Sequence, residues 1–382
     1  MKEFDRIMIY ESSLDGHRLE YIHHLYCYCV ESKYSYVFSL PHSFNEVKTM
    51  MEWPANPGNI SFSFFDNSEI EKSKNIFQLS YRKARSIIRE SKINKTNNVF
   101  LISFLEIFPL FYIMSFFTKI RVSGIIYKIY LYKWQSYSII KKIIIFLLYF
   151  LIRISRNVFK CFVLNDATAT IYLNKIWKTD KFVYLPDPIN TSQPYVVRNT
   201  PMMNKVRFLH FGALTRRKGT INILKAIGIS DPSHLSNFEF IFAGKLYEDI
   251  HDDFWGLVNL NRNKTSIIVK DYFLDYDELD GLCAECDVLL APYDNTDSSS
   301  GVVSYAAKYN KPVVVPNSGL LSKLVKKNHL GICIKNNSEE CLCDYFQHFR
   351  PLVINTKNSK EYLKKNSIKN FCIVIFSTLA KN

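Results

Sequence analysis

The chain has 382 residues, of which 48% are hydrophobic and 22% are charged. This length exceeds what one hydrophobic core usually serves, so we expect two domains. The apolar content excludes a disordered chain. Lys and Arg number 49 against 35 Asp and Glu, for a net charge of +14. This balance favours anionic partners and says nothing about the fold.

Much of the positive charge is concentrated in one segment. Between Ile107 and Asn165 the sequence contains nine Lys and Arg residues and no Asp or Glu. Within this segment Lys141 and Lys142 precede an apolar run, which Arg153 ends. The run is too short to cross a bilayer. It predicts either a helix that lies on anionic lipid or a buried crossover helix with basic ends.

The cysteines and acidic clusters give little support to a disulfide framework or a metal site. The nine cysteines are an odd number, and the N-terminus has no secretory signal, so we expect a cytoplasmic protein. Cys283 and Cys286 have CxxC spacing but no second pair. The acids at 251–253 and 275–277 fall at predicted helix starts, where acidic residues favour the helix dipole. We expect no metal and no other cofactor.

Strands alternate with helices along the first half of the chain. The expected strands are 6–11, 34–40, 60–65, 99–104, 159–164 and 182–185, and the expected helices include 17–31 and 77–91. An apolar helix is expected after residue 104. Such alternation indicates a parallel sheet with helices on both faces. Leu185-Pro186-Asp187-Pro188 and the polar stretch to Asn204 then mark a domain boundary.

The alternation continues in the second half. The expected strands are 207–211, 238–243, 266–269, 288–291, 312–316 and 331–334, and the expected helices are 219–229, 249–259, 276–285, 301–309, 320–327 and 339–348. The pattern predicts two Rossmann-like, doubly wound α/β domains, over 1–187 and 188–350, that face each other across a cleft. A C-terminal tail over 351–382 can return to the first domain. Ligands of such sheets bind beyond the carboxyl ends of the strands.

The loop after the first strand of the second domain is the strongest candidate site. Gly212 lets a phosphate approach the backbone, and a helix with free N–H groups begins at Gly219. Arg216, Arg217 and Lys218 add three cations, which are unfavourable at a helix N-terminus unless an anion binds there. The alternative is a solvated basic loop. The spacing matches neither a Walker loop nor the dinucleotide GxGxxG.

Three further positions are candidates on weaker signals. Residues 298–301 (Ser-Ser-Ser-Gly) open another helix, where they offer N–H groups to an anion or simply cap the helix. Gly16 precedes His17 in the first loop, and that histidine is either structural or functional. Glu106 follows a first-domain strand and is a candidate for an acceptor contact.

These motifs carry a resemblance to a known family. Gly212, Leu214, Lys218 and Gly219 fit the pattern Gly-x-Leu-x-x-x-Lys-Gly. Further matches are Ala243-Gly244, the stretch 287–292, the stretches 299–303 and 306–313, the linker 185–188 and Gly16-His17. The second domain resembles the donor-binding half of family-4 (group 1) retaining glycosyltransferases, which have the GT-B fold. The resemblance is strongest over 185–335.

The resemblance implies roles for named residues. It implies catalytic roles for Lys218, Arg216 and Asp297, donor-binding roles for Gly212, Gly219, Ser299, Ser300, Gly301, Val302 and Tyr305, and acceptor-side roles for Gly16, His17 and Glu106. Two departures stand out. The family's pair of glutamates, eight positions apart, falls on Asp297 and Tyr305. The family's base after the loop glycine is replaced by Ala213, and Arg216 can substitute for it.

The implied activity is hexosyl transfer, with retention, from a nucleotide sugar to a saccharide or lipid-linked acceptor in surface polysaccharide biosynthesis. The implied setting is the inner face of the cytoplasmic membrane, with 133–160 on anionic lipid. The alternative is a degenerate GT-B protein that binds a nucleotide sugar or a partner without turnover, as Tyr305 suggests. Nucleic acid is not an expected partner, because no recognised binding module is present.

Overall fold

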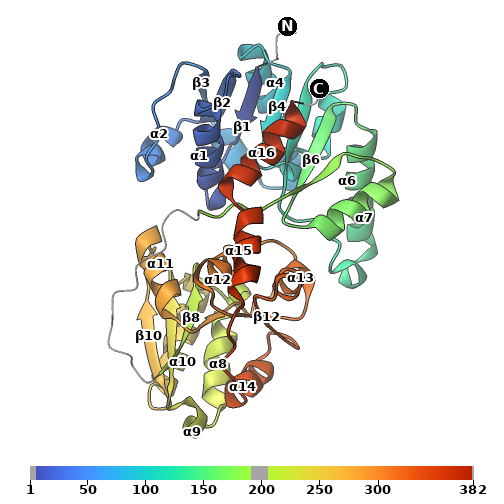
Figure 1. Cartoon of the computed structure of the whole chain (residues 1–382). Helices are drawn as coiled ribbons and strands as arrows, with labels where there is room; N and C mark the ends of the chain where they lie inside the picture. The colour runs from blue at the N-terminus through green and yellow to red at the C-terminus, as the bar shows by residue number, and fades with distance from the viewer. Residues whose placement is uncertain (1–5, 191–204, 381–382) are drawn as a thin grey trace. The chain divides into compact units, whose positions relative to one another are not determined.

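The computed structural model describes residues 6–190 and 205–380 (Figure 1). The chain forms two compact units, Met1–Pro186 with Ile368–Asn382, and Asp187–Ser367. The polar stretch predicted as a linker lies mostly in 191–204, outside the described residues. The second unit extends past the predicted boundary at residue 350, because the helix after it packs on this unit.

The first unit is built on a parallel sheet of seven strands in the order β3-β2-β1-β4-β5-β6-β7. The strands are β1 Ile7–Tyr10, β2 Tyr36–Pro41, β3 Ile60–Phe65, β4 Asn98–Leu101, β5 Arg121–Ile126, β6 Val158–Leu164 and β7 Phe182–Leu185. β5 was not predicted from the sequence, and β4 ends at Leu101 rather than at the predicted Phe104, where the chain has already left the strand. β1 pairs with both β2 and β4, so the strand order reverses at β1.

Helices cover both faces of this sheet. They are α1 His17–Val30, α2 Phe44–Val47, α3 Ser68–Glu71, α4 Ile76–Ile93, α5 Leu110–Met114, α6 Ile139–Ile154, α7 Ala167–Trp177 and α16 Ile368–Leu379, with 3-10 turns η1 Lys48–Met50, η2 Leu105–Ile107 and η3 Trp134–Ser136. Side chains of α1 and α16 share one core, and side chains of α4, α5, α6 and α7 share the other. In the described part of the chain no helix is both long enough and apolar enough to span a bilayer.

The second unit has a parallel sheet of six strands in the order β10-β9-β8-β11-β12-β13. The strands are β8 Val206–Phe211, β9 Phe238–Ala243, β10 Ser266–Lys270, β11 Val288–Leu290, β12 Val313–Pro316 and β13 Gly331–Ile334. The helices are α8 Thr220–Ile229, α9 Pro232–Leu235, α10 His251–Asn261, α11 Tyr276–Glu285, α12 Gly301–Tyr309, α13 Gly319–Asn328, α14 Glu339–Gln347 and α15 Thr356–Lys365, with turns η4 Arg216–Lys218 and η5 Glu248–Ile250. Two parallel-sheet α/β units are therefore present, as predicted.

The C-terminal tail is divided between the units. α15 packs on α12 of the second unit, whereas α16 lies beside α1 of the first unit (Figure 1). Phe371 of α16 is fully buried, and its ring centroid lies 5.2 Å from that of Tyr21. Cys372 Sγ donates to the carbonyl oxygen of His24 at 3.5 Å. The apolar face of α16 therefore completes the core on the α1 side of the first sheet.

We expect Phe371→Ala to lower the free energy of unfolding by about 3–5 kcal/mol, because it leaves a cavity in this core. Ile373→Ala on the same helix is the matched control, since Ile373 is partly exposed, and it should change stability by about 1 kcal/mol or less. Urea denaturation followed by circular dichroism measures both. Equal effects of the two substitutions would show that α16 does not contribute a buried face.

Candidate functional site

The candidate site in the second unit lies where the strand order reverses. β8 is flanked by β9 and β11, so the loops after β8 and β11 leave neighbouring strands at their carboxyl ends. Open α/β sheets bind ligands at this switch point. The loop after β8 holds 212–219, and the loop after β11 holds 291–300. The two loops predicted from sequence thus lie at one edge of one sheet.

Two glycines shape the first loop, and one of them, Gly219, holds the two loops close together. Gly212 has φ +91° and Gly219 has φ +75°, a backbone region that disfavours side chains. A Cβ added to Gly219 would stand 2.1 Å from the carbonyl oxygen of Pro292, so the backbones of the two loops touch there. The N–H of Asp294 donates to the carbonyl oxygen of Arg217 at 3.0 Å, which joins the loops a second time.

Lys218 folds back over the glycine turn. A Cβ added to Gly212 would lie 2.6 Å from Lys218 Nζ, so the absent side chain leaves the space that the ammonium group occupies. Lys218 Nζ also lies 5.4 Å from the ring centroid of Tyr293, in a cation–π contact. α8 begins directly after, at Thr220. A cation, a glycine backbone and a helix N-terminus therefore meet at one point, which is the composition of an anion site.

Arg216 has a different partner. Its Nη2 donates to Asp253 Oδ2 of α10 at 2.7 Å, and both side chains are more than half exposed. Exposed pairs of this kind are weak, so a stronger anion can compete for the guanidinium. Arg217 is exposed at the surface of the same turn. Lys218 is thus the cation that the structure places against the glycine turn.

The buried side chain of His210, next to the loop after β8, makes hydrogen bonds to two neighbouring elements. Its Nδ1 lies 2.9 Å from the carbonyl oxygen of Leu290, and its Nε2 lies 3.0 Å from Thr220 Oγ1. Burial lowers the pKa of His210 to about 4, so the ring is neutral at neutral pH. Because a carbonyl only accepts, Nδ1 carries the proton, and Thr220 donates to Nε2. His210 therefore ties β8 to β11 and to the start of α8.

The loop after β11 presents the start of α12. Ser300 is the N-cap residue of α12, yet its side chain makes no capping hydrogen bond. Ser299 Oγ instead donates to Asp187 Oδ2 at 2.5 Å. The structure therefore shows no N-capping of α12 by the Ser300 side chain. The first N–H groups of α12, which include those of Gly301 and Val302, receive no side-chain cap from Ser300.

The two positions on which the glutamate pair of the resembled family falls, Asp297 and Tyr305, differ in environment. Asp297 is only 1% exposed, and neither carboxylate oxygen has a hydrogen-bond partner among the described residues. A buried carboxylate without partners is unfavourable, and donor groups of a ligand would satisfy it. Tyr305 packs edge-on against Phe211, with ring centroids 5.4 Å apart. This contact joins α12 to the end of β8.

The acceptor-side candidates also lie at a switch point, that of the first sheet. Gly16 has φ +60° and is the N-cap of α1, in the loop that follows β1. His17 is largely exposed, and its Nδ1 lies 3.5 Å from Glu20 Oε2. Glu106 belongs to η2, which follows β4, the neighbour of β1. The structure thus places these residues on neighbouring loops of the first unit.

Glu106 is held by two cations. Its Oε1 accepts from Arg18 at 2.7 Å, and its Oε2 accepts from Lys83, which is only 4% exposed. Lys83 Nζ also lies 3.7 Å from Oε1 of Glu11, a buried carboxylate directly after β1. Neither Glu11 nor Lys83 was predicted as a site residue from the sequence. The position of Glu11 at the end of the first strand is the signal that would have found it.

Metal ligands are not gathered in the part of the chain that the structure describes: no group of three His, Cys, Asp or Glu residues is arranged to hold an ion. Cys283 and Cys286 are buried, and burial raises the pKa of both thiols, that of Cys286 to about 12. These thiols are therefore protonated at neutral pH, in the environment of structural rather than reactive cysteines.

The environment of Asp297 leads to a stability prediction. We expect Asp297→Asn to raise the free energy of unfolding of the ligand-free protein by about 1–3 kcal/mol, because it removes a buried charge without partners. Asp249→Asn is the control, since this exposed carboxylate lies away from the loop and should change stability by less than about 0.5 kcal/mol. Urea denaturation at neutral pH measures both variants. A destabilised Asp297→Asn protein would mean that the carboxylate has a partner within the fold.

The comparisons with known proteins bear on the fold. No family model and no curated protein sequence matches this chain. Among solved structures, Anabaena HepE in complex with UDP has a TM-score of 0.69 at 12% identity over 99% of both chains. A Rickettsia africae glycosyltransferase has a TM-score of 0.65 at 15% identity over 100% of both chains. WaaG, a glycosyltransferase involved in lipopolysaccharide biosynthesis, has a TM-score of 0.63 at 13% identity over 98% of this chain and 99% of its own. The chain therefore shares the two-domain GT-B fold of these glycosyltransferases.

Proposed function

We propose that the protein is a retaining glycosyltransferase that moves a hexosyl group from a nucleotide sugar to a saccharide or lipid-linked saccharide acceptor, in surface polysaccharide biosynthesis. The observation that carries this proposal is the position of Lys218, whose ammonium group lies over the Gly212 turn beside the start of α8. A diphosphate bound there would meet a cation and free backbone N–H groups. The start of α12 would supply further N–H groups.

The proposed donor contacts divide between two loops. Lys218, with Arg216 released from Asp253, would hold the diphosphate, and Asp297 would accept hydrogen bonds from hydroxyl groups of the donor sugar. These contacts would supply the neutralisation of charge for which other enzymes use a metal, so we propose transfer without one. HepE binds UDP and UDP-glucose in its solved complexes. UDP-glucose is therefore the first donor to assay.

The proposed reaction needs no nucleophile from the protein. The bond between the anomeric carbon and the diphosphate oxygen breaks, and a new bond forms from the acceptor oxygen on the same face of the sugar. The proton of the acceptor hydroxyl passes to the leaving phosphate oxygen. Negative charge on the diphosphate grows as the sugar leaves, so contacts with Lys218 and the helix N-termini strengthen in the transition state.

A second candidate function is donor binding without turnover. Tyr305 supports it, because its ring packs on Phe211 and cannot bind a ribose diol as a carboxylate would. The two candidates differ in one measurement. A transferase consumes UDP-glucose when saccharide and lipid-linked acceptors are supplied, whereas a binding protein is only stabilised by it against heat.

For the transferase, we expect Lys218→Ala to raise the barrier of the chemical step by about 2–4 kcal/mol and to weaken donor binding much less. Arg217→Ala is the matched control on the same turn, because Arg217 is exposed, and it should have little effect. Single-turnover rates and donor affinity, measured in excess EDTA, give both quantities. A folded Lys218→Ala protein with the parent rate would remove the diphosphate site, and loss of all activity in EDTA would contradict metal-free transfer.

We also propose that the protein associates with the inner face of the cytoplasmic membrane through 133–160. α6 turns Ile145, Tyr149 and Ile152 toward the sheet. Leu148 and Leu151 are partly buried against the same core. The other large apolar side chains of the helix are exposed: Ile139, Ile140, Ile143, Ile144, Phe146, Leu147, Phe150 and Ile154. α6 thus combines a buried face with a wide apolar surface in water, where such surfaces mark membrane or protein contacts.

The charges around α6 favour anionic lipid as the contact. Lys133, Lys141 and Arg153 are all exposed at or near the ends of the helix. Each base near an anionic surface contributes about 1 kcal/mol.

We expect the protein to co-sediment with vesicles that contain phosphatidylglycerol at low salt and to detach as salt rises, because ions screen the attraction. Ile144→Glu with Leu147→Glu should weaken this binding at least about tenfold. Val353→Glu, at another exposed apolar position, should leave binding unchanged. Equal binding of the parent to neutral vesicles would contradict the charge argument.

A further inference from the structure

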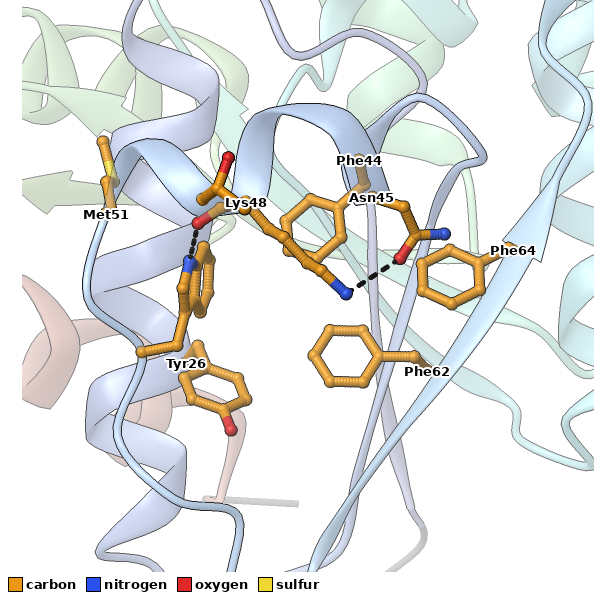
Figure 2. A pocket seen from close by; sticks show the side chains of 9 residues that line it. Tyr26, Phe44, Asn45, Lys48, Met51, Phe62 and Phe64 are labelled. Carbon is orange, nitrogen blue, oxygen red and sulfur yellow. Dashed lines mark hydrogen bonds between the residues drawn. The ribbon is translucent and has the colours of Figure 1, made fainter.

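The first unit contains a cavity of about 400 Å³ that the proposed transfer reaction does not use (Figure 2). It is lined by Tyr26, Phe44, Asn45, Lys48, Thr49, Met51, Trp53, Phe62 and Phe64. These residues come from α1, from α2 and η1 with the segment after it, and from β3. β3 is an edge strand of the sheet, and β2 separates it from β1 and the switch point. The cavity is therefore distinct from the loops that carry Gly16 and Glu106.

Aromatic ring faces form one wall of the cavity. The rings of Phe62 and Phe64 have centroids 5.9 Å apart and an interplanar angle of 9°. Phe44 lies within 25° of both planes. Figure 2 shows these three rings face-on, side by side. Phe62 is 36% exposed and Phe64 is 37% exposed, so the surface they form is open to water rather than closed into a tunnel.

The polar groups of the lining are arranged around these rings. Trp53 Nε1 donates to the carbonyl oxygen of Lys48 at 2.6 Å, and Tyr26 donates to that of Pro54 at 3.0 Å, so both are already satisfied. Lys48 Nζ donates to Asn45 Oδ1 at 3.2 Å, and the lysine side chain runs past the Phe44 ring toward Asn45 (Figure 2). No ion pair forms between Lys48 and a described carboxylate. The ammonium group is therefore available to an acidic ligand.

We propose that this cavity binds a saccharide unit that carries a carboxylate. The C–H groups on one face of a pyranose ring are weakly positive, and they would rest on the negative faces of Phe62 and Phe64. The carboxylate would pair with Lys48, and ring hydroxyls would hydrogen-bond to Asn45. The volume fits one or two sugar rings, within the range of small-molecule sites. If the proposed transferase function holds, the bound unit belongs to the acceptor, away from the hydroxyl that reacts.

The placement of the cavity favours a saccharide over a lipid chain. Tyr26 and Phe44 belong to the core on the α1 side of the sheet, whereas α6, with its exposed apolar surface, packs on the other core. The cavity and α6 thus lie on opposite faces of the first sheet. A cavity on the face away from the proposed membrane contact opens to water and is not in reach of acyl chains. A ligand that is soluble in water and still has flat apolar faces suits such a cavity, and an acidic polysaccharide has both properties.

Saturation-transfer NMR on the full-length protein tests this proposal, with hyaluronan tetrasaccharide as the acidic probe and cellotetraose as the neutral one. We expect the acidic probe to bind more tightly than the neutral probe. Phe62→Ala with Phe64→Ala should weaken binding of the acidic probe at least about tenfold, which corresponds to roughly 1.4 kcal/mol. Phe117→Ala, at a fully exposed phenylalanine of the same unit, is the control and should change nothing. Lys48→Gln should reduce the preference for the acidic probe to about twofold or less.

Failure of this proposal is distinguishable from failure of the proposed function. UDP-glucose affinity is measured on the same variants and should stay within about twofold of the parent, since the donor loops belong to the other unit. The saccharide site would be overturned if neither tetrasaccharide binds. It would also be overturned if the acidic probe still binds after Phe62 and Phe64 are both replaced by alanine. Displacement of the acidic probe by farnesyl phosphate would overturn it as well, because it would indicate a site for apolar chains. Acidic-probe binding without UDP-glucose binding would support the cavity and count against the transferase.

Discussion

The contact between Gly219 and Pro292 is the constraint from which the rest of the second-unit site follows. A Cβ at Gly219 would overlap the Pro292 carbonyl oxygen, at 2.1 Å, so this approach exists only because glycine stands there. It brings together the loops after β8 and β11. It also fixes the turn that precedes it, so that Lys218 reaches back over Gly212. The position of the cation is thus set by backbone packing rather than by an acidic partner.

The two switch points differ in how their charges are balanced. In the first unit, Glu106 is neutralised by Arg18 and by Lys83. In the second unit, Lys218 has an aromatic ring as its neighbour, and Asp297 is buried with no hydrogen-bond partner among the residues that the structure describes. Unbalanced buried or half-buried charge lowers stability, and proteins retain it mainly where a ligand completes it. The switch point of the second sheet is therefore the better candidate for a charged donor, and the switch point of the first sheet for an uncharged, hydroxyl-bearing part of the acceptor.

Local patterns in the sequence were enough to predict most of the second unit. Its strands are short apolar runs bounded by loops, and Gly212 and Gly219 mark a turn whose chemistry is local. β5 was missed because Arg121–Ile126 lies inside a long acid-free apolar segment, where strand and helix periodicities cannot be separated.

Contacts between residues far apart in the sequence left no local signal. The pair of Arg216 with Asp253 and that of Lys83 with Glu11 form only when the helices pack on the sheet. The aromatic wall could not be predicted for the same reason. Phe44 lies in a short helix and Phe62 in an edge strand, and only the fold brings their rings together.

The exposed apolar surface of the first unit is divided by chemistry as well as by position. α6 presents mainly branched aliphatic side chains on a convex helix, and bases flank them. The cavity beside β3 presents flat rings with an amide and one ammonium group.

The two surfaces also lie far apart on the first sheet. α6 connects β5 to β6, and β3 lies four strand positions from β5, which is roughly 20 Å across the sheet. Aliphatic chains mix readily with acyl chains, whereas flat rings pack best against flat partners. Because the two surfaces also lie on opposite faces of the sheet, a membrane bound by α6 would leave the aromatic wall in water, where a polysaccharide can reach it.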